Sequence, residues 1–433
     1  MFFDRPSSGE LAVLVHLELT QSDEINDPRE FEELVLSAGG DPVAFLTGAR
    51  AIPNAKYFIG TGKLEELRLL VDEHEAELVI FNHVLSPSQE RNLEKELKCR
   101  VLDRTGLILD IFAQRARTHE GKLQVELAQL HHMSTRLIRG WTHLERQKGG
   151  IGLRGPGETQ LETDRRLLRA RIKSIGKRLE KVRRQRDQGR RARSRADIPT
   201  VSLVGYTNAG KSTLFNAMTE ADVYVQDQLF ATLDPTMRRI ELDRVGAAVL
   251  ADTVGFISHL PHRLVEAFRA TLEEAVNSDL LLHVVDAATE ERQRNMEQVQ
   301  EVLTEIGADQ VPQLCVYNKI DLMENMPPRI DRDEQGRPVA VWVSAQNKMG
   351  LDVLREALIE LLGNKMFEGQ VRLGSQMGSL RARFHRANAV IEECYQDDGS
   401  CLLSLRLPET DLNKILAAET VTRSDLQGLI DAA

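Results

Sequence analysis

The chain has 433 residues, of which 42% are hydrophobic and 28% are charged, and its formal net charge is −10. This length suits about two to four domains whose cores need no disulfide staples, and the composition excludes wholesale disorder. The four cysteines form no CxxC pair and no histidine lies at zinc-ligand spacing, which predicts a reducing, cytoplasmic compartment and no zinc site. No apolar run reaches the ~18 residues that cross a membrane, and residues 1–8 contain no signal-peptide core.

The charge is unevenly distributed along the chain. Residues 165–195 hold fifteen Lys or Arg and two acids, a local net charge of +13 that leaves −23 for the remainder. An acidic protein is not expected to bind nucleic acid, DNA included, through its general surface. A basic segment of this density instead indicates a docking element for one partner.

Residues 1–118 alternate short apolar runs with amphipathic runs. The patterns predict strands at 11–19, 77–81 and 100–102, and helices at 31–38, 63–74 and 87–97. This alternation is typical of a small α/β domain, which we place at residues 1–118. Gly60-Thr61-Gly62-Lys63 precedes a helix, where an ordinary tight turn is favoured over an anion site. The sequence leaves open whether this domain binds a second nucleotide.

Residues 119–196 carry two apolar heptad stripes separated by a glycine-rich loop. The first stripe consists of Leu123, Leu127, Leu130, Leu137, Trp141 and Leu144, and the second of Leu168, Ile172, Ile175, Leu179 and Val182. Between them, residues 149–157 hold five glycines. Two apolar seams joined by a helix-breaking loop predict an antiparallel helical hairpin whose second helix carries the basic run.

The remaining chain divides into a region that carries nucleotide motifs, residues 197–364, and a tail, residues 365–433. The tail shows a helix-like stretch, then a strand-like stretch at 401–407 and a second helix-like stretch at 410–418. This order predicts a small α+β domain.

A phosphate-binding loop is the first of the nucleotide motifs. A strand at 200–204 runs directly into GxxxxGKS and then into a helix, which is the context that the motif requires. The loop consists of Gly205, Tyr206, Thr207, Asn208, Ala209, Gly210, Lys211 and Ser212. Its backbone N–H groups and the helix N-terminus attract phosphate, while the predicted roles are bridging of the β- and γ-phosphates for Lys211 and Mg²⁺ ligation for Ser212.

A DxxG motif follows the apolar strand at 248–251 and consists of Asp252, Thr253, Val254 and Gly255. At the end of a strand, Asp252 is placed to hold the magnesium shell, and the N–H of Gly255 is placed to sense the γ-phosphate. We therefore expect Gly255 to act with Lys211 in catalysis.

Two further motifs identify the base as guanine. Residues 314–317 end in Asn318, Lys319, Ile320 and Asp321, and a strand at 341–343 leads to Ser344, Ala345 and Gln346. The Asp321 carboxylate can accept two hydrogen bonds from guanine, which adenine cannot donate, so a buried unpaired carboxylate would reject adenine. The order and spacing of four motifs indicate a GTP and GDP site and disfavour a kinase.

A switch I segment is expected between the phosphate loop and Asp252. The candidate residues are Phe230, Ala231, Thr232, Leu233 and Asp234, which we assign to the nucleotide site. Such a segment offers a threonine that closes on Mg²⁺ when the γ-phosphate is present. Thr232 is the preferred catalytic and metal-binding residue, with Thr236 as the alternative.

FATLDPT, DTVGF and NKID, together with GGIGLRGPGETQLETDRR at 149–166, resemble the HflX family of bacterial GTPases, which is related to Obg. The resemblance covers roughly residues 1–365. It implies a two-part N-terminal region ahead of a Ras-like G domain. It also implies association with the large ribosomal subunit, a role in separating or rescuing ribosomes, and hydrolysis that the ribosome stimulates.

Phe256 occupies the position after DxxG where many Ras-like GTPases place a glutamine that orients the attacking water. An apolar side chain cannot polarise water, so slow intrinsic hydrolysis is expected. The alternative is that Phe256 only packs and that another group already supplies an efficient route.

The basic helix and the glycine-rich tip are the predicted RNA-binding element. Gly150 permits close approach of another backbone, and Arg154, Arg165, Arg166 and Arg169 are candidate contacts to ribosomal RNA, with no carboxylates expected nearby to pair with the basic residues. The alternative is that this charged helix is only exposed to solvent and does not bind RNA. The function expected is a monomeric, ribosome-directed GTPase. The alternative is a signalling GTPase with a protein or membrane effector.

Overall fold

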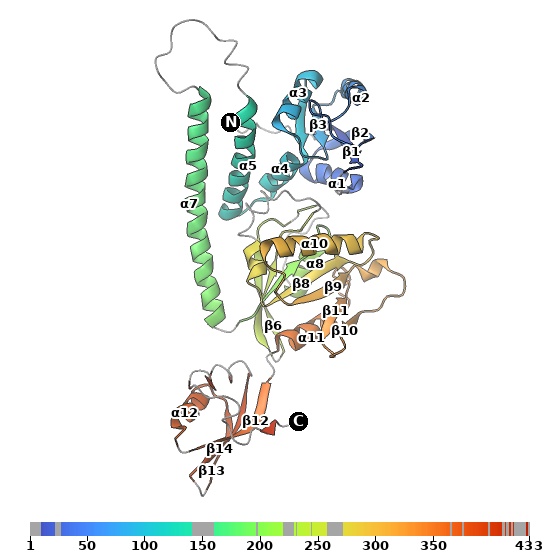
Figure 1. The fold of residues 1–433 in the computed structure, drawn as a ribbon. Helices are drawn as coiled ribbons and strands as arrows, with labels where there is room; N and C mark the ends of the chain where they lie inside the picture. The colour runs from blue at the N-terminus through green and yellow to red at the C-terminus, as the bar shows by residue number, and fades with distance from the viewer. Residues whose placement is uncertain are drawn as a thin grey trace. The chain divides into compact units, whose positions relative to one another are not determined.

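A computed structural model shows how the predicted elements assemble (Figure 1). It describes residues 10–21, 27–140, 160–195, 198–219, 229–230, 232–243, 245–257, 272–363 and most of 366–408. Beyond these ranges it describes 412, 415, 416, 419 and 430–431. The glycine-rich loop, including Gly150 and Arg154, and Ala231 of switch I lie outside the described residues.

The N-terminal region is a four-stranded parallel sheet with the strand order β2-β1-β3-β4. Its elements are β1 (Leu11–Leu19), α1 (Pro28–Ala38), β2 (Asp41–Arg50), α2 (Thr61–Glu73), β3 (Leu78–Phe81), α3 (Pro87–Leu97), β4 (Arg100–Asp103) and α4 (Arg104–Arg115). The predicted small α/β domain is therefore confirmed, whereas β2 and α4 were not predicted. Local caps start the helices: Asp27 accepts from the N–H of Arg29, and Ser86 forms a capping box with Gln89.

Alternate residues of β1 feed two separate cores on the two faces of this sheet. Ala12 and Leu14 pack with Phe31 of α1 and Phe112 of α4, whereas Val13 and its alternate neighbours pack under α2 and α3. A strand covered on both faces reads as a continuous apolar run, as 11–15 does.

Two long helices, α5 (His119–Gly140) and α7 (Gln160–Arg195), lie side by side and form the predicted arm (Figure 1). The second apolar stripe is confirmed on α7, since Ile175 is fully buried while Lys173 and Lys177 beside it are exposed. The first stripe is only partly within the described side chains, because Leu137, Trp141 and Leu144 fall outside them.

The nucleotide region is a seven-stranded sheet with the order β10-β11-β9-β8-β5-β7-β6. The pairs from β11 to β7 are parallel, and β10 is antiparallel to β11. Its strands are β5 (Thr200–Val204), β6 (Thr236–Leu242), β7 (Gly246–Asp252), β8 (Leu280–Asp286), β9 (Gln313–Asn318), β10 (Arg329–Arg332) and β11 (Pro338–Trp342). The helices are α8 (Lys211–Thr219), α10 (Arg292–Ile306), the short η1 (Ile320–Leu322) and α11 (Leu351–Leu362). The motifs all follow the carboxyl ends of β5, β7, β9 and β11, where open α/β sheets bind ligands.

The tail forms an antiparallel sheet of its own, with the order β13-β14-β12-β15. Its elements are β12 (Met366–Leu373), α12 (Gly378–Arg386), β13 (Val390–Tyr395), β14 (Cys401–Pro408) and β15 (Ile430–Asp431). Phe384 and Leu403 are central in its core. This confirms the predicted α+β tail, while most of the helix expected at 410–418 lies outside the described residues. Among the described residues, no helix is long and apolar enough to cross a membrane.

Candidate nucleotide site

The phosphate loop is fixed by backbone contacts with the segment that follows β7. The N–H of Thr207 donates to the carbonyl of Phe256 at 2.7 Å, and the N–H of Phe256 donates to the carbonyl of Gly205 at 3.1 Å. Lys211 is buried, and its Nζ donates to the carbonyls of Gly205 at 3.0 Å and Tyr206 at 2.6 Å. The loop thus presents a preformed ring of backbone groups with one ammonium at its base.

Two buried groups give this site its electrostatic character. Burial lowers the pKa of Lys211 to about 8, although the neighbouring Asp252 acts to raise it. Burial likewise raises the pKa of Asp252, against the hydrogen bonds that it accepts from Ser212 and Thr232. Phosphate oxygens placed beside Lys211 would raise its pKa again, so the site is electrostatically suited to an anionic ligand.

Three oxygen-bearing side chains meet at one point beside the phosphate loop. The hydroxyl of Ser212 donates to Asp252 Oδ2 at 2.7 Å and lies 2.8 Å from the hydroxyl of Thr232, which donates to the same Oδ2 at 3.0 Å. Asp252 is fully buried, and its Oδ1 has no hydrogen-bond partner among the residues that the structure describes. Oxygen ligands around an unsatisfied buried carboxylate fit Mg²⁺, which Ser212 and Thr232 would hold directly, with Asp252 beside them.

Thr232, rather than the alternative Thr236, reaches this cluster. Thr236 is the first residue of β6 and is not among the partners of Ser212 or Asp252. Thr232 thus brings its segment against the phosphate loop, an arrangement that we call closed.

Gly255 lies in close contact with the phosphate loop. A Cβ atom at this position would lie 2.9 Å from Cγ2 of Thr207 and 3.0 Å from Nζ of Lys211, so only glycine fits without a shift. Phe256, the next residue, is 2% exposed and packs into a cluster with Val204 and Leu303. Its ring is therefore part of the core and supplies no group that orients water.

Asn318 connects the phosphate loop with the guanine side of the site. Its Nδ2 donates to the carbonyl of Ala209 at 2.9 Å, and its Oδ1 accepts from the N–H of Ala345 at 3.0 Å. Lys319 has the left-handed backbone angle φ of 66° and pairs with Asp286 at the end of β8 at 2.8 Å. This pair fixes the Lys319 stem that we expect to stack on the base.

The other predicted base-side residues surround this bridge. Asp321 lies in η1 and is exposed, as its proposed hydrogen bonds to guanine require. Ile320 is buried, Ser344 and Met349 close a short turn by mutual backbone bonds, and Gln346 is exposed.

Several predicted site residues direct their side chains away from any nucleotide. Phe230 and Leu233 are buried in the hydrophobic cluster of α1 and α4, and Asp234 faces Thr118. Thr253 donates to the carbonyl of Leu203 at 2.5 Å, and Val254 is buried. For Phe230, Leu233 and Asp234, only backbone contact with a nucleotide is compatible with this arrangement.

Two residues that belong to the site were missed by reasoning from the sequence. Asp286 pairs with Lys319, and Glu30 of α1 accepts a hydrogen bond from the hydroxyl of Tyr206 in the phosphate loop. An acidic residue at the end of the strand next to β5 was a signal that could have revealed Asp286. No local signal marks Glu30, because it is 176 residues from Tyr206.

The candidate RNA contacts on α7 differ in exposure. Arg166 and Arg169 are exposed, whereas Arg165 is half-buried. The expectation that the basic residues lack nearby carboxylates was wrong, because ion pairs join Arg171 to Glu126 at 2.6 Å, Arg183 to Glu273 at 2.5 Å and Arg186 to Glu120 at 2.8 Å. Part of the positive charge therefore fixes α7 to its neighbours.

Comparisons with known proteins identify the family. A model described as GTP-binding GTPase N-terminal matches residues 26–113, a GTP-binding GTPase middle region matches 115–193, and a 50S ribosome-binding GTPase matches 200–319. A GTPase HflX from Escherichia coli is 60% identical over 417 residues, covering 96% of this chain and 98% of that protein. The chain belongs to the HflX family of GTPases.

Further similar proteins include another HflX relative and a solved structure. A GTPase HflX from Magnetococcus marinus is 50% identical and covers 82% of this chain and 81% of its own length. A GTP-binding protein of Sulfolobus solfataricus in complex with GDP aligns over 82% of this chain and 98% of that one, with 25% identity and a TM-score of 0.43. Membership of the HflX family confirms GTP binding and GTP hydrolysis, the activity that the four motifs predicted.

Proposed function

We propose that this protein is a GTP-dependent factor that docks on the large ribosomal subunit, separates or rescues ribosomes, and hydrolyses GTP faster when docked. The observation that carries the proposal is the closed switch I, in which Thr232 contacts both Ser212 and Asp252. A second support is the exposed basic surface on α7. The match of residues 200–319 to a 50S ribosome-binding GTPase points to the same partner.

The chemistry is transfer of the γ-phosphoryl group to water, and the residues of the chain act mainly by positioning. Lys211 places its positive charge where negative charge develops on the phosphates, and the Gly255 N–H is placed to donate to the γ-phosphate. Ser212 and Thr232 would hold Mg²⁺, which would supply positive charge beside the phosphates. Asn318 fixes the position of the phosphate loop relative to Ala345 on the guanine side of the site, and Asp321 recognises guanine.

Hydrolysis by the isolated protein is slow in this proposal because Phe256 is in the core and orients no water. The ribosome would complete the site, either by supplying a group or by ordering a switch residue. Hydrolysis on the ribosome would then end the GTP-bound state, and the factor would be released.

We assign the parts of this function to four regions. Residues 1–118 and the arm, 119–196, make the ribosomal contacts, residues 197–364 bind the nucleotide, and 365–433 form a separate small domain. On the arm, Arg166 and Arg169 contact phosphates of ribosomal RNA, together with Arg165 and with Gly150 and Arg154 of the glycine-rich segment. The protein acts as a monomer in the cytoplasm.

The test is sedimentation of the purified protein with ribosomal subunits, in GDP or a non-hydrolysable GTP analogue, over a series of salt concentrations. The GTP form is expected to pellet with the large subunit and to lose affinity steeply as salt rises. A double variant, Arg166→Gln with Arg169→Gln, is expected to lower the salt slope by about 2. The matched control, Arg329→Gln with Arg337→Gln on the β10–β11 hairpin, removes the same charge and should bind as the wild type does.

The alternative is a signalling GTPase whose basic arm docks on acidic protein or anionic lipid. RNase treatment distinguishes the two functions. Co-purification of a partner that persists after RNase treatment, and that added ribosomal subunits do not change, favours the alternative. Binding of neither subunit in either nucleotide state would overturn the ribosomal assignment, while leaving the GTPase assignment intact.

A further inference from the structure

Asp234 of switch I is hydrogen-bonded to the residues at the start of α5, outside the nucleotide region. We call this set of hydrogen bonds the clamp. Asp234 Oδ2 accepts from the backbone N–H groups of Arg117 and Thr118, each at 2.8 Å, and Oδ1 accepts from the hydroxyl of Thr118. Thr118 in turn accepts from the N–H of Gly121 at 2.9 Å, as an N-terminal helix cap does. An anion beside the N-terminus of a 22-residue helix also has a favourable interaction with its dipole.

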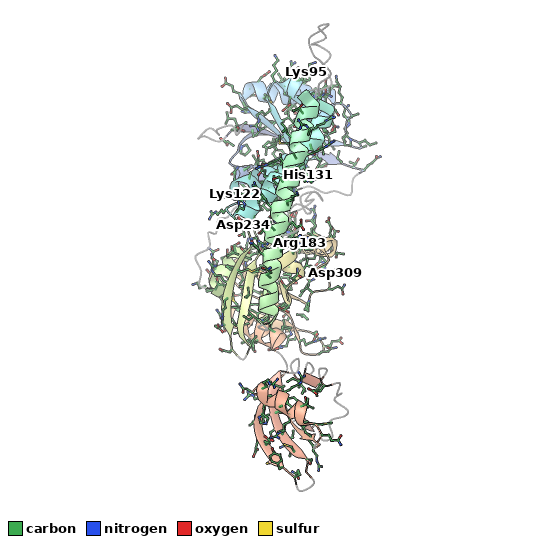
Figure 2. All side chains as sticks on the ribbon, turned by 90° about the vertical axis from the view of Figure 1, so that its left-hand side faces the viewer. Lys95, Lys122, His131, Arg183, Asp234 and Asp309 are labelled. Atoms are coloured by element: carbon green, nitrogen blue, oxygen red, sulfur yellow. The ribbon has the colours of Figure 1, made fainter. Side chains whose placement is uncertain are left out.

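A glycine makes this close approach possible. A Cβ atom on Gly121 would lie 2.1 Å from Oδ1 of Asp234, a distance that forces the carboxylate to move. Figure 2 labels Asp234 together with Lys122, which follows Gly121 in the first turns of α5. The clamp thus depends on a specific small residue as well as on the hydrogen-bonding groups of Thr118.

The segment ahead of Thr232 is fixed to the same N-terminal region. The N–H of Leu229 donates to the hydroxyl of Ser37 at 3.1 Å, and the Phe230 ring meets the Phe112 ring edge-on with centroids 4.7 Å apart. Leu229, Phe230 and Leu233 are each 2–3% exposed. Thr232 therefore stands between two anchored stretches, 229–230 and 233–234, in the position where its hydroxyl meets Ser212 and Asp252.

We propose that Asp234 is a positioning residue: by clamping residues 117 and 118, it holds switch I closed so that Thr232 can serve the Mg²⁺ and γ-phosphate site. GTP binding and docking of switch I on the N-terminal region then favour each other, because thermodynamic coupling is reciprocal. GDP lacks the γ-phosphate and gains little from a closed switch I, so the clamp discriminates between the two nucleotides. This inference rests on GTP binding and not on the ribosomal partner.

The test uses the full chain and measures equilibrium affinity for GDP and for a non-hydrolysable GTP analogue by fluorescence, with Mg²⁺ present. Asp234→Ala is expected to weaken the GTP analogue about tenfold relative to GDP, equivalent to losing about one hydrogen bond to a charged group. Asp309→Ala is the matched control, because Asp309 lies apart from Asp234 (Figure 2) and its carboxylate accepts a hydrogen bond from the neighbouring Gln310. It should leave both affinities unchanged.

Thr118→Val decides whether Asp234 acts through the clamp or on the nucleotide itself. The double variant combines Asp234→Ala with Thr118→Val. If Asp234 acts through the clamp, the double variant loses no more GTP-analogue affinity than Asp234→Ala alone, since both changes remove the same interaction. Gly121→Ala is the second variant. Alanine favours a helix over glycine, so α5 should remain stable, yet displacement of Asp234 should weaken the GTP analogue about as much as Asp234→Ala does.

Two results would overturn the proposal. The first is an equal loss of GDP and GTP-analogue affinity in Asp234→Ala, and the second is independent, multiplying losses in the Asp234 and Thr118 variants. If Asp234→Ala proves unfolded by its melting curve, Gly121→Ala decides alone: unchanged nucleotide preference in a folded Gly121→Ala protein refutes the clamp.

Discussion

Asn318 offers the sharpest test of how the nucleotide site is assembled. Its amide is 2% exposed and bonds to the carbonyl of Ala209 at 2.9 Å and to the N–H of Ala345 at 3.0 Å. Asn318→Ala leaves both backbone groups without this partner, at about 1–3 kcal/mol for each. A combined loss of about 3 kcal/mol would weaken nucleotide binding roughly 150-fold.

The loss is expected to be equal for GTP and GDP, because Asn318 joins the base side to the phosphate loop and does not contact switch I. Titration with fluorescent GDP and a fluorescent GTP analogue measures it, and a melting curve establishes that the variant is folded. The matched control is Asn92→Ala, which removes one exposed side-chain bond to the carbonyl of Lys56 in the N-terminal region. Affinity within about threefold of the wild type in a folded Asn318→Ala protein would refute the bridging role.

The remaining predictions concern titration and thiol chemistry. Burial lowers the pKa of free Lys211 to about 8, and bound phosphate raises it. GDP affinity should therefore fall by about fivefold between pH 8 and 9, whereas Lys211 adds little pH dependence below 7, and a flat titration contradicts this. Burial lowers the pKa of His83 to about 4, so unfolded chains bind more protons between pH 6.5 and 4. The unfolding free energy should therefore drop by up to about 3 kcal/mol as pH falls through that window, and less in His83→Gln, as urea melts would show. Burial raises the pKa of Cys99 and Cys315 to about 11, so iodoacetamide should label exposed Cys394 first, and mass spectrometry that finds the other two labelled at equal rates would contradict this.

The elements that sequence predicted well are those with a clear period or a short motif. The strand at 11–19 matches β1 to the residue, and the phosphate loop stands where GxxxxGKS requires it. Such motifs are local, because consecutive backbone groups and one or two side chains make most of the contacts with the phosphates.

Two elements of the N-terminal domain escaped prediction for physical reasons. β2 is an edge strand in which only Leu46 is fully buried, so its side chains show little alternation between apolar and polar. α4 has the opposite problem, since residues 107–109, Ile111 and Phe112 are all buried and leave no amphipathic stripe. A short helix that is buried on most sides cannot be distinguished from a strand by periodicity alone.

The parts of the site that sequence could not supply are contacts between distant segments. Asp234 was predicted as a nucleotide-binding residue, but its carboxylate is directed to Thr118, 116 residues away. Glu30 reaches Tyr206 of the phosphate loop and also pairs with Arg104. These contacts follow from the way in which the α1 and α4 surfaces pack against switch I, and no single segment encodes that packing.

The central claim is that a ribosome completes a GTPase site whose own water-orienting position is filled by buried Phe256. The most direct test is single-turnover GTP hydrolysis by the full chain, measured as purified large ribosomal subunits are added, with small subunits as the control. We predict slow hydrolysis by the protein alone and a saturable increase of at least about a hundredfold with large subunits only, as partner-supplied groups provide in other GTPases. Turnover by the isolated protein that equals the rate at saturating large subunits would contradict it.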